Sequence, residues 1–299
     1  METVLTNATF VIPEWLNREH YPFESKFLEI NDNKVHYIDE GKGDIILFSH
    51  PACAWSFMYR DMIKVLSKEF RCIALDYPGF GFSIPSKAYE YTIESQSKIL
   101  NAFIEKLNLE DLYFLGHDTG GPSGFYIAAQ KPELFKGFIF TGTIMFPTNE
   151  FKKLHNFIGV LSTWPLKIIN QQFNIVVWAM VNKLKAQKVP KDVQQHYFNI
   201  FNTKEKRERV RKLLVNLKDS TAIMITIKDA MSSKLSKKPS LLIYGVKDPV
   251  NELGIPERAA SILSNSELHL IENEGHFPHE GNGERMALII KDWLLGKNQ

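Results

Sequence analysis

Short apolar runs alternate with longer amphipathic stretches along most of the chain. The apolar runs end in turn residues and predict buried strands, whereas apolar residues at helical spacing predict the helices between them. Two such runs flank residues 31–33 and predict a hairpin. The expected strands are 26–30, 34–39, 44–49, 70–75, 112–115, 136–141, 240–244 and 267–271, and the expected helices are 59–68, 95–107, 119–130, 256–263 and 284–295.

The alternation stops after residue 141 and returns at residue 240. The segment between these positions has helical patterns at 161–185 and 191–201 and no convincing strand. Strands that alternate with helices form mostly parallel sheets with helices on both faces. We therefore expect an α/β fold with a mostly parallel central sheet, flanked by helices and interrupted by an inserted helical cap.

The interruption also predicts the domain boundaries. The expected core domain consists of residues 1–147 and 236–299, and the expected cap domain of residues 148–235. In open sheets of this kind, ligands bind beyond the carboxyl ends of the strands. The residues that follow the strands are therefore the candidates for chemistry.

Composition excludes several classes of protein. The chain has 299 residues, of which 44% are hydrophobic and 23% charged, as in ordinary globular proteins. A net charge of +2 gives no strong attraction to nucleic acid, and two cysteines form no disulfide framework. Residues 1–15 lack the pattern of a signal peptide, and no apolar run has transmembrane length. We expect a soluble, cytoplasmic monomer or homodimer with no nucleic-acid or membrane partner.

The strand at 112–115 leads into Gly116-His117-Asp118-Thr119-Gly120-Gly121. A glycine two residues before and two residues after a central residue is the spacing of a nucleophile elbow between a strand and a helix. The turn is strained, and larger side chains at the glycine positions would collide with the neighbouring backbone. An aspartate that only caps the helix needs no glycine on either side. The sequence therefore predicts Asp118 as a carboxylate nucleophile.

Two later strand ends supply partners for this nucleophile. Asp248 lies just past one strand, and His276 follows the last strand after a glycine. The order nucleophile, acid, histidine is the one expected for an elbow of this type. His279 competes for the histidine position, but His276 is preferred because it follows glycine directly at the strand exit. The predicted catalytic residues are Asp118, Asp248 and His276.

An upstream strand ends in His50-Pro51-Ala52. This position usually donates one backbone N–H to an oxyanion hole, and the residue after the nucleophile donates the second. Pro51 has no N–H, so the predicted donors are Ala52 and Thr119. His50 is interpreted as a structural histidine that hydrogen-bonds this loop.

These segments together resemble the α/β hydrolases that use an aspartate nucleophile, which include haloalkane dehalogenases and soluble epoxide hydrolases. The likeness to haloalkane dehalogenases is the greater, because Trp55-Ser56-Phe57-Met58-Tyr59-Arg60 is similar to their usual Trp-Ser-Phe-Leu-Tyr-Arg. The resemblance also rests on Asp76-Tyr77-Pro78-Gly79-Phe80-Gly81-Phe82-Ser83. It covers residues 25–145 and 238–295 but not the cap.

The resemblance implies an α/β-hydrolase fold and a two-step mechanism. Ionised Asp118 attacks an electrophilic carbon and forms an alkyl ester. His276, oriented by Asp248, then takes a proton from the water that attacks the ester carbonyl. The N–H groups of Ala52 and Thr119 stabilise the oxyanion. The expected substrate is a small hydrophobic organic molecule together with water, and no cofactor or metal is implied.

The chain departs from each reaction type within the family. Dehalogenases hold the leaving halide with a tryptophan after the nucleophile and often an asparagine after a His-Gly pair, and here these positions are Thr119 and Ala52. Cap tryptophans, Trp164 or Trp178, are candidate replacement donors. Epoxide hydrolases usually carry two cap tyrosines, and this cap has only Tyr197. Epoxide hydrolysis by the same triad therefore remains an alternative.

Aromatic residues are expected to line a largely apolar pocket beneath the cap. A non-catalytic ligand-binding protein on the same scaffold is a further alternative, although such a protein would not need the complete triad. The charged run at 204–212 is interpreted as a solvated helix face. The predicted substrate-binding residues are Trp55, Phe146, Trp164, Trp178 and Tyr197.

Overall fold

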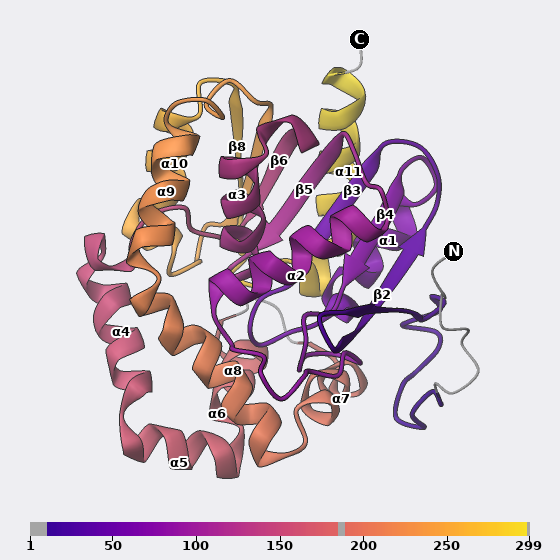
Figure 1. The fold of residues 1–299 in the computed structure, drawn as a ribbon, viewed down its shortest axis with the longest axis vertical. Coiled ribbons are helices and arrows are strands. Elements are labelled where there is room, and N and C mark those ends of the chain that lie inside the picture. The colour runs from indigo at the N-terminus through magenta and orange to yellow at the C-terminus, as the bar shows by residue number, and fades with distance from the viewer. Residues whose placement is uncertain (1–10, 185–188, 298–299) are drawn as a thin grey trace.

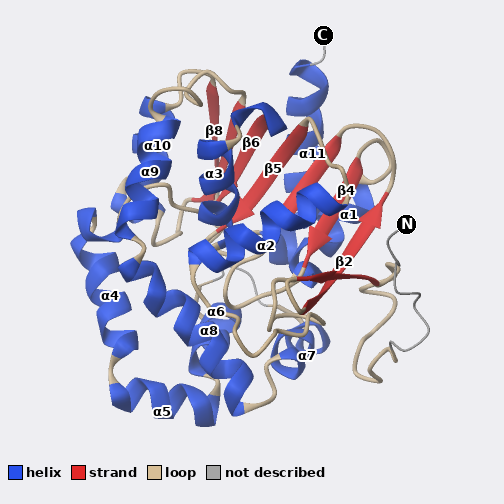
Figure 2. Ribbon diagram, viewed as in Figure 1, coloured by secondary structure: helices blue, strands red, loops and turns tan. Residues whose placement is uncertain are grey.

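The structure is a computed structural model, and it describes residues 11–184 and 189–297. The described residues form one eight-stranded sheet with helices on both faces (Figures 1 and 2), which confirms the predicted α/β architecture. The strand order is β1-β2-β4-β3-β5-β6-β7-β8. The strands are β1 (Lys26–Ile30), β2 (Asn33–Glu40), β3 (Ile45–Ser49), β4 (Arg71–Leu75), β5 (Leu112–His117), β6 (Phe135–Thr141), β7 (Ser240–Gly245) and β8 (Ser266–Ile271).

Only the first two strand pairs of the described sheet are antiparallel. β1 pairs with β2 in the predicted hairpin, and β2 pairs with β4, whereas the pairs from β4 to β8 are parallel. Asn31 and Asp32 make the hairpin turn at φ values of 48° and 61°, which their short polar side chains tolerate. The parallel strands point their carboxyl ends toward the helices at the bottom of Figure 2, and the site therefore lies at this edge.

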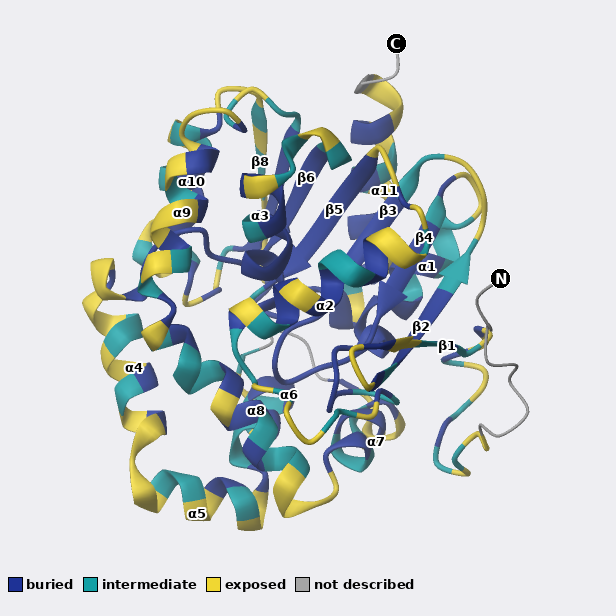
Figure 3. Ribbon diagram, viewed as in Figure 1, coloured by how far each residue is buried: buried dark blue, intermediate teal, exposed yellow. Residues whose placement is uncertain are grey.

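Two groups of helices cover the sheet. α1 (Arg60–Leu66) packs against α11 (His279–Lys297) on one face, and α2 (Ile93–Lys106) packs against α3 (Gly120–Gln130) on the other. α10 (Ile255–Ile262) follows β7 and contacts β8. Every residue of β5 and β7 is buried, as expected for central strands covered on both faces (Figure 3). Short 3₁₀ turns lie at Ser56–Tyr59, Pro132–Leu134, Thr148–Glu150, Leu217–Asp219 and Asn251–Leu253.

Six helices occupy the described part of the chain between β6 and β7. The last of them packs against α3, so this part of the predicted cap lies on the core. The other helices gather at the carboxyl edge of the sheet (Figure 1). The six helices are α4 (Lys152–Ser162), α5 (Trp164–Phe173), α6 (Ile175–Asn182), α7 (Lys191–Ile200), α8 (Lys204–Asn216) and α9 (Thr221–Met231). No described helix is long and apolar enough to cross a membrane.

The prediction of one continuous helix over 161–185 is wrong. Thr163 is extended, and Pro165 lies in the first turn of α5, where its missing N–H is tolerated, whereas a helix interior would require that N–H. Asn174 takes a left-handed conformation at φ 52° and separates α5 from α6. The predicted end of the helix, Lys185, lies outside the described residues.

The charged run at 204–212 belongs to α8 and is not wholly a solvated face. Arg211 and Glu208 form a buried ion pair, in which Nη2 and Oε1 are 2.7 Å apart and Nε and Oε2 are 2.9 Å apart. Arg211 also donates to the Leu161 carbonyl at the end of α4. Charges that look solvated in the sequence therefore hold cap helices together.

Candidate active site

Asp118 lies in the tight turn between β5 and α3. Its φ of 45° is unusual for a residue other than glycine, and this is the strained conformation expected of an elbow. A Cβ atom on Gly116 would lie 2.4 Å from the Gly121 Cα, and one on Gly120 would lie 2.3 Å from the Ser49 carbonyl oxygen. Both distances are too short for a real side chain, so the flanking glycines are needed for the turn to close.

His276 and Asp248 meet beside this turn. The Nδ1 atom of His276 lies 3.0 Å from both carboxylate oxygens of Asp248. Asp248 is fully buried, and its Oδ1 also accepts the Val250 N–H at 2.8 Å. Burial alone would lower the pKa of His276, but the carboxylates of Asp248 and Asp118 outweigh it and raise the pKa to about 9. The resting histidine is therefore held as a cation between two acids.

The Asp118 carboxyl is subject to opposing effects. Burial raises its pKa, while the charge of His276 and the backbone N–H of Thr119 lower it, and the net pKa is above the ordinary value. The Thr143 hydroxyl donates to the Asp118 carbonyl at 2.7 Å and fixes the turn from the adjacent β6 strand end. The structure therefore brings the three predicted catalytic residues into one electrostatically coupled group.

His279, the competitor for the histidine position, does not pair with Asp248. Its ring lies 4.5 Å from the His117 ring, and neither ring nitrogen has a hydrogen-bond partner among the described residues. Burial and the nearby charge of His276 lower its pKa to about 3. His279 is thus a neutral residue that packs between the rings of His117 and Tyr59.

The two predicted oxyanion donors lie together, but in an arrangement that the sequence does not predict. The Ala52 N–H donates to the Thr119 Oγ1 at 2.8 Å, and both residues are fully buried. The Ala52 N–H is therefore already engaged by a side chain, whereas the Thr119 N–H faces the Asp118 carboxyl and lowers its pKa. The Thr119 hydroxyl therefore occupies the hydrogen bond that the Ala52 N–H was expected to offer to an oxyanion.

His50 has the structural role predicted for it. Its Nδ1 donates to the Pro51 carbonyl at 2.8 Å, and its Nε2 accepts the Tyr77 N–H at 2.9 Å. Burial lowers the pKa of His50, which keeps the ring neutral for both hydrogen bonds. The histidine ties the loop after β3 to the loop after β4.

The predicted pocket aromatics do not gather at one place. Trp55 is fully buried and stacks on Phe57 at 5.4 Å, and Phe146 is buried beneath the Arg258 guanidinium. The side chains of Trp164 and Trp178 are 73% and 46% exposed, so the prediction that they line an enclosed pocket is wrong. Helical spacing in the cap identifies apolar faces but does not say which face turns inward.

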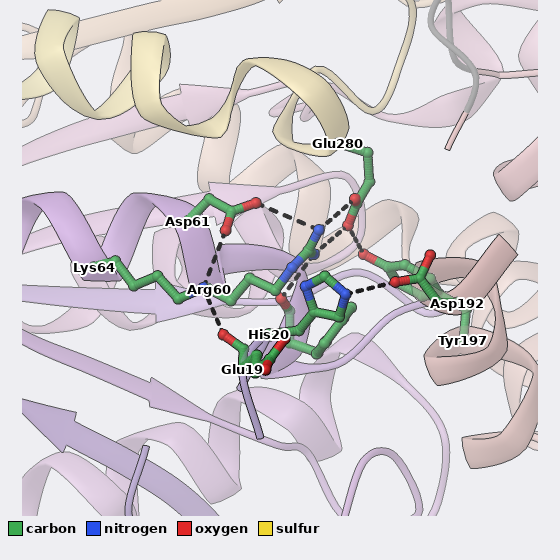
Figure 4. Close-up of polar contacts among 9 residues, drawn as sticks. Glu19, His20, Arg60, Asp61, Lys64, Asp192, Tyr197 and Glu280 are labelled. Carbon is green, nitrogen blue, oxygen red and sulfur yellow. Dashed lines mark hydrogen bonds and ion pairs between the residues drawn. The ribbon is translucent and has the colours of Figure 1, made fainter. Parts of the chain in front are cut away.

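The hydroxyl of Tyr197 is engaged within the protein. Its hydroxyl donates to the Glu280 carboxylate, four positions after His276 (Figure 4). The same carboxylate accepts two hydrogen bonds from Arg60, at 2.6 and 2.8 Å, and all three side chains are buried. Tyr197 comes from cap helix α7 and Arg60 from core helix α1, so Glu280 joins the two parts of the chain.

A second cap contact holds the histidine loop directly. The His276 backbone N–H donates to the Leu184 carbonyl, just after α6, at 2.7 Å. Together with the Tyr197–Glu280 hydrogen bond, this contact fixes the loop at both ends. We call these two contacts, Leu184–His276 and Tyr197–Glu280 with Arg60, the cap clamp. The sequence motif contained Arg60, but nothing in it identified Leu184 or Glu280.

Replacing Tyr197 with phenylalanine tests the cap clamp. The change removes one hydrogen bond to a buried carboxylate and is expected to lower the free energy of unfolding by about 1–3 kcal/mol. Urea unfolding measures the loss. Tyr126→Phe is the matched control, because the Tyr126 hydroxyl makes no hydrogen bond within the described residues and is partly exposed. Equal stability of the two variants would contradict a stabilising role for the clamp.

No group of three or more histidine, cysteine, aspartate or glutamate side chains in the described chain is arranged to hold a metal ion. The groups that the site offers for chemistry are the side chains and backbone N–H groups already described. A carboxylate nucleophile, an acid–histidine pair and backbone donors are the groups that ester formation and hydrolysis require.

Two relatives match most of the length of the chain. Haloalkane dehalogenase 2 of Mycobacterium tuberculosis is 28% identical over 271 residues, which cover 90% of this chain and 94% of that protein. A cis-3-alkyl-4-alkyloxetan-2-one decarboxylase of Shewanella oneidensis is 27% identical, covering 91% of this chain and 89% of that protein.

Solved structures show the same fold at lower sequence identity. A putative ancestral haloalkane dehalogenase has a TM-score of 0.81 at 22% identity, covering 91% of this chain and 98% of that one. A haloalkane dehalogenase from Agrobacterium tumefaciens C58 has a TM-score of 0.80 at 20% identity, covering 91% and 96%. The family model for the alpha/beta hydrolase fold matches residues 44–282. The chain therefore belongs to the α/β-hydrolase fold family, as an enzyme of the hydrolase class that resembles haloalkane dehalogenases.

Proposed function

We propose that this enzyme hydrolyses a small hydrophobic substrate, of the haloalkane type, through an alkyl ester on Asp118. The observation that carries the proposal is the strained carboxylate at the elbow beside the His276–Asp248 pair. In the first step an Asp118 oxygen forms a bond to the substrate carbon. The bond from that carbon to the leaving group breaks, and the leaving group departs with the electron pair.

The charge of the site explains why His276 serves the second step. A cation beside ionised Asp118 suits the first step, which needs no base. Once Asp118 is a neutral ester, His276 loses the nearby negative charge that helps to raise its pKa. The lower pKa favours release of the imidazolium proton to solvent. The neutral histidine can then take a proton from water, and the resulting hydroxide adds to the ester carbonyl. Collapse of the adduct releases the alcohol and regenerates Asp118.

A single turnover in oxygen-18 water tests the ester mechanism. Because water attacks the carbonyl carbon of Asp118, the label is expected in the Asp118 carboxylate, and the alcohol carries the original enzyme oxygen. Peptide mass spectrometry and product analysis measure both. Label found only in the alcohol would mean that water attacks the substrate directly, which would refute the ester. Halide release identifies the dehalogenase reaction, whereas diol formation would identify epoxide hydrolysis.

The position of Thr119 suggests a specific role in the second step. Its hydroxyl accepts the Ala52 N–H and keeps one hydrogen to donate. A hydroxyl that accepts one hydrogen bond becomes a stronger donor in the next. We therefore assign the oxyanion donors as the Thr119 N–H and the Thr119 hydroxyl, with Ala52 acting through that hydroxyl.

Replacing Thr119 with valine tests this assignment. The variant keeps the shape but lacks the hydroxyl, and it is expected to hydrolyse the ester about 10²-fold more slowly. Thr119→Ser keeps the hydroxyl and is expected to stay near the wild-type rate. Rapid-quench mass measurements separate ester formation from ester hydrolysis. A valine variant that hydrolyses the ester faster would show that the hydroxyl blocks the Ala52 N–H.

The relative named as an oxetan-2-one decarboxylase favours a second reaction of the same nucleophile. Asp118 would attack the saturated ring carbon that is bonded to the ring oxygen. The bond between that carbon and the ring oxygen would break, and the former lactone group would become a carboxylate. Loss of carbon dioxide then forms the carbon–carbon double bond and expels the Asp118 carboxylate. No water enters, so this reaction predicts no oxygen-18 in Asp118 and formation of an alkene.

Epoxide hydrolysis has weaker support than either reaction. It would use a cap hydroxyl to hold the epoxide oxygen, and the Tyr197 hydroxyl is engaged by Glu280. We infer that residues 148–235 determine the substrate, because α4–α8 lie at the carboxyl edge of the sheet, where Asp118 also lies. The expected partners are one small hydrophobic molecule and water.

A further inference from the structure

One face of cap helix α5 is apolar and open to solvent. Trp164 and Phe173 are 73% and 74% exposed, and Ile168 and Ile169 are 37% and 40% exposed. Trp164 and Ile168 are one helical turn apart, as are Ile169 and Phe173, and the four residues together span about half of the helix circumference. Only Asn170 of α5 is buried, because the helix packs against α8 on one side and leaves its other side open to solvent. Exposed apolar surface that is concentrated in this way marks an interaction site more often than a scattered residue does.

The apolar surface continues into the preceding helix. Phe157 and Val160 of α4 are 59% and 55% exposed, and they lie just before Trp164 in the chain. Figure 3 shows exposed positions along the outer sides of α4 and α5, away from the sheet. We define the cap apolar face as Phe157, Val160, Trp164, Ile168, Ile169 and Phe173.

The segment that carries this face is strongly basic. Between Glu150 and Asp192 the sequence contains seven lysines and no aspartate or glutamate. The remaining 29 basic and 34 acidic side chains give the rest of the chain a net charge of −5. The small overall charge of +2 is therefore the sum of a positive segment in the cap and a negative remainder of the chain. Such a charge asymmetry orients a protein near a charged surface.

Individual lysines lie close to the exposed apolar residues. Lys152 and Lys153 are exposed, and Lys153 precedes Phe157 by one helical turn. Lys167 lies between Trp164 and Ile168 in α5, where its charge also lowers the pKa of Glu208. Long lysine side chains can lay their methylene stems along apolar surface while the charge reaches outward. Exposed aromatic residues with lysines nearby are typical of helices that bind at the interface of an anionic membrane.

We propose that the cap apolar face docks on the surface of a bilayer that contains anionic lipids. The aromatic and aliphatic side chains enter the boundary between headgroups and acyl chains, and the lysines contact lipid phosphates. A second copy of the chain fits less well, because a symmetric contact would bring two lysine-rich segments together without acidic partners. The sequence led us to expect no membrane partner, because the overall charge is small and no apolar run could span a bilayer. Docking on the membrane surface requires no spanning helix, so it differs from the kind of membrane contact which that expectation considered.

Vesicle flotation of the full chain tests the proposal. Vesicles of phosphatidylcholine with phosphatidylserine are expected to bind the protein about tenfold or more tightly than vesicles of phosphatidylcholine alone, and added salt is expected to weaken binding. Trp164→Ser with Phe173→Ser is expected to reduce binding about tenfold or more. Lys152→Glu with Lys153→Glu, at two exposed lysines of α4, is expected to reduce it on anionic vesicles specifically.

Matched controls use residues of the same kind elsewhere. Leu288 and Leu295 in α11 are 51% and 39% exposed, so Leu288→Ser with Leu295→Ser removes apolar surface far from the cap. Lys42→Glu with Lys68→Glu makes the same charge change at two exposed lysines of the core. Circular dichroism and thermal unfolding check that each variant is folded.

Three results would overturn the proposal. One is the absence of binding to anionic vesicles, and another is equal loss of binding in cap and control variants. The third is concentration-dependent dimerisation that the serine variants abolish, without vesicle binding, since this would identify the face as a contact between copies. Each measurement is independent of catalysis, so failure of the reaction proposed for Asp118 would leave this inference standing.

Discussion

A His276→Gln enzyme is expected to stop after the first half of the reaction and to accumulate an alkyl ester on Asp118. Glutamine can still donate to Asp248, but it cannot take a proton from water, so the ester forms and does not hydrolyse. Removal of a general base lowers turnover by about 10²–10⁴-fold. Incubation with a panel of haloalkanes, followed by intact-mass measurement and peptide mapping, is expected to place the added alkyl group on Asp118.

Two variants control for this experiment. Asp118→Asn together with His276→Gln removes the nucleophile and is expected to give no adduct. His279→Gln changes a neighbouring buried histidine that does not pair with Asp248, and it is expected to turn over without accumulating ester. A folded His276→Gln enzyme with no adduct from any substrate, or with an adduct on another residue, would contradict the proposed mechanism. Continued alkene formation from an oxetan-2-one by the same variant would support the second reaction.

Gly142→Ala is expected to impair both stability and catalysis, although glycine at this position contributes no functional group. A Cβ atom here would lie 2.8 Å from the His117 Cε1, 3.1 Å from the His276 Nδ1 and 3.2 Å from the Asp248 Oδ2. The added methyl group would therefore press on the hydrogen bond between the acid and the histidine. A displaced catalytic group can cost about 10²-fold in rate, and we expect a loss of this size in ester hydrolysis.

The backbone contributes separately, because Gly142 has a φ of +53°, which costs an alanine about 1–2 kcal/mol. Gly254→Ala isolates this strain, since Gly254 has a φ of +68° and no atom of the described residues lies within 4 Å of the position that an added Cβ would take. Both variants are expected to lose stability in urea unfolding, but only Gly142→Ala is expected to lose activity. Equal activity of the two would show that the triad tolerates the methyl group.

The placement of Asp118, Asp248 and His276 at one edge of the sheet could be predicted because the sequence signals for it are local. The glycines around Asp118 are needed for backbone contacts within the elbow, and Asp248 and His276 follow strands that end at one edge of the sheet. The rotamer of Thr119 could not be predicted, since it depends on the Ala52 N–H from another strand end, 67 positions away. Gly142 carried a weak signal as a glycine directly after β6, but its importance depends on three side chains from distant segments.

The cap was predicted less well for a different physical reason. Apolar residues at helical spacing define a face of a helix, but only the tertiary partner decides whether that face turns inward. Trp164 was therefore interpreted as a pocket residue although it is exposed. Likewise, Glu208 and Arg211 looked like solvated charges because their burial depends on packing between α8 and α4.

The cap clamp has a consequence for how new substrate preferences can arise on this scaffold. Exchanging residues 148–235 for the corresponding segment of a relative would shift the backbone carbonyl now contributed by Leu184 and replace the Tyr197 hydroxyl, and these two groups hold the histidine loop. A chimera could then gain a differently shaped entrance and still turn over poorly, because the base would be poorly aligned. Grafts that keep these two anchor points are the ones in which specificity and rate can vary independently.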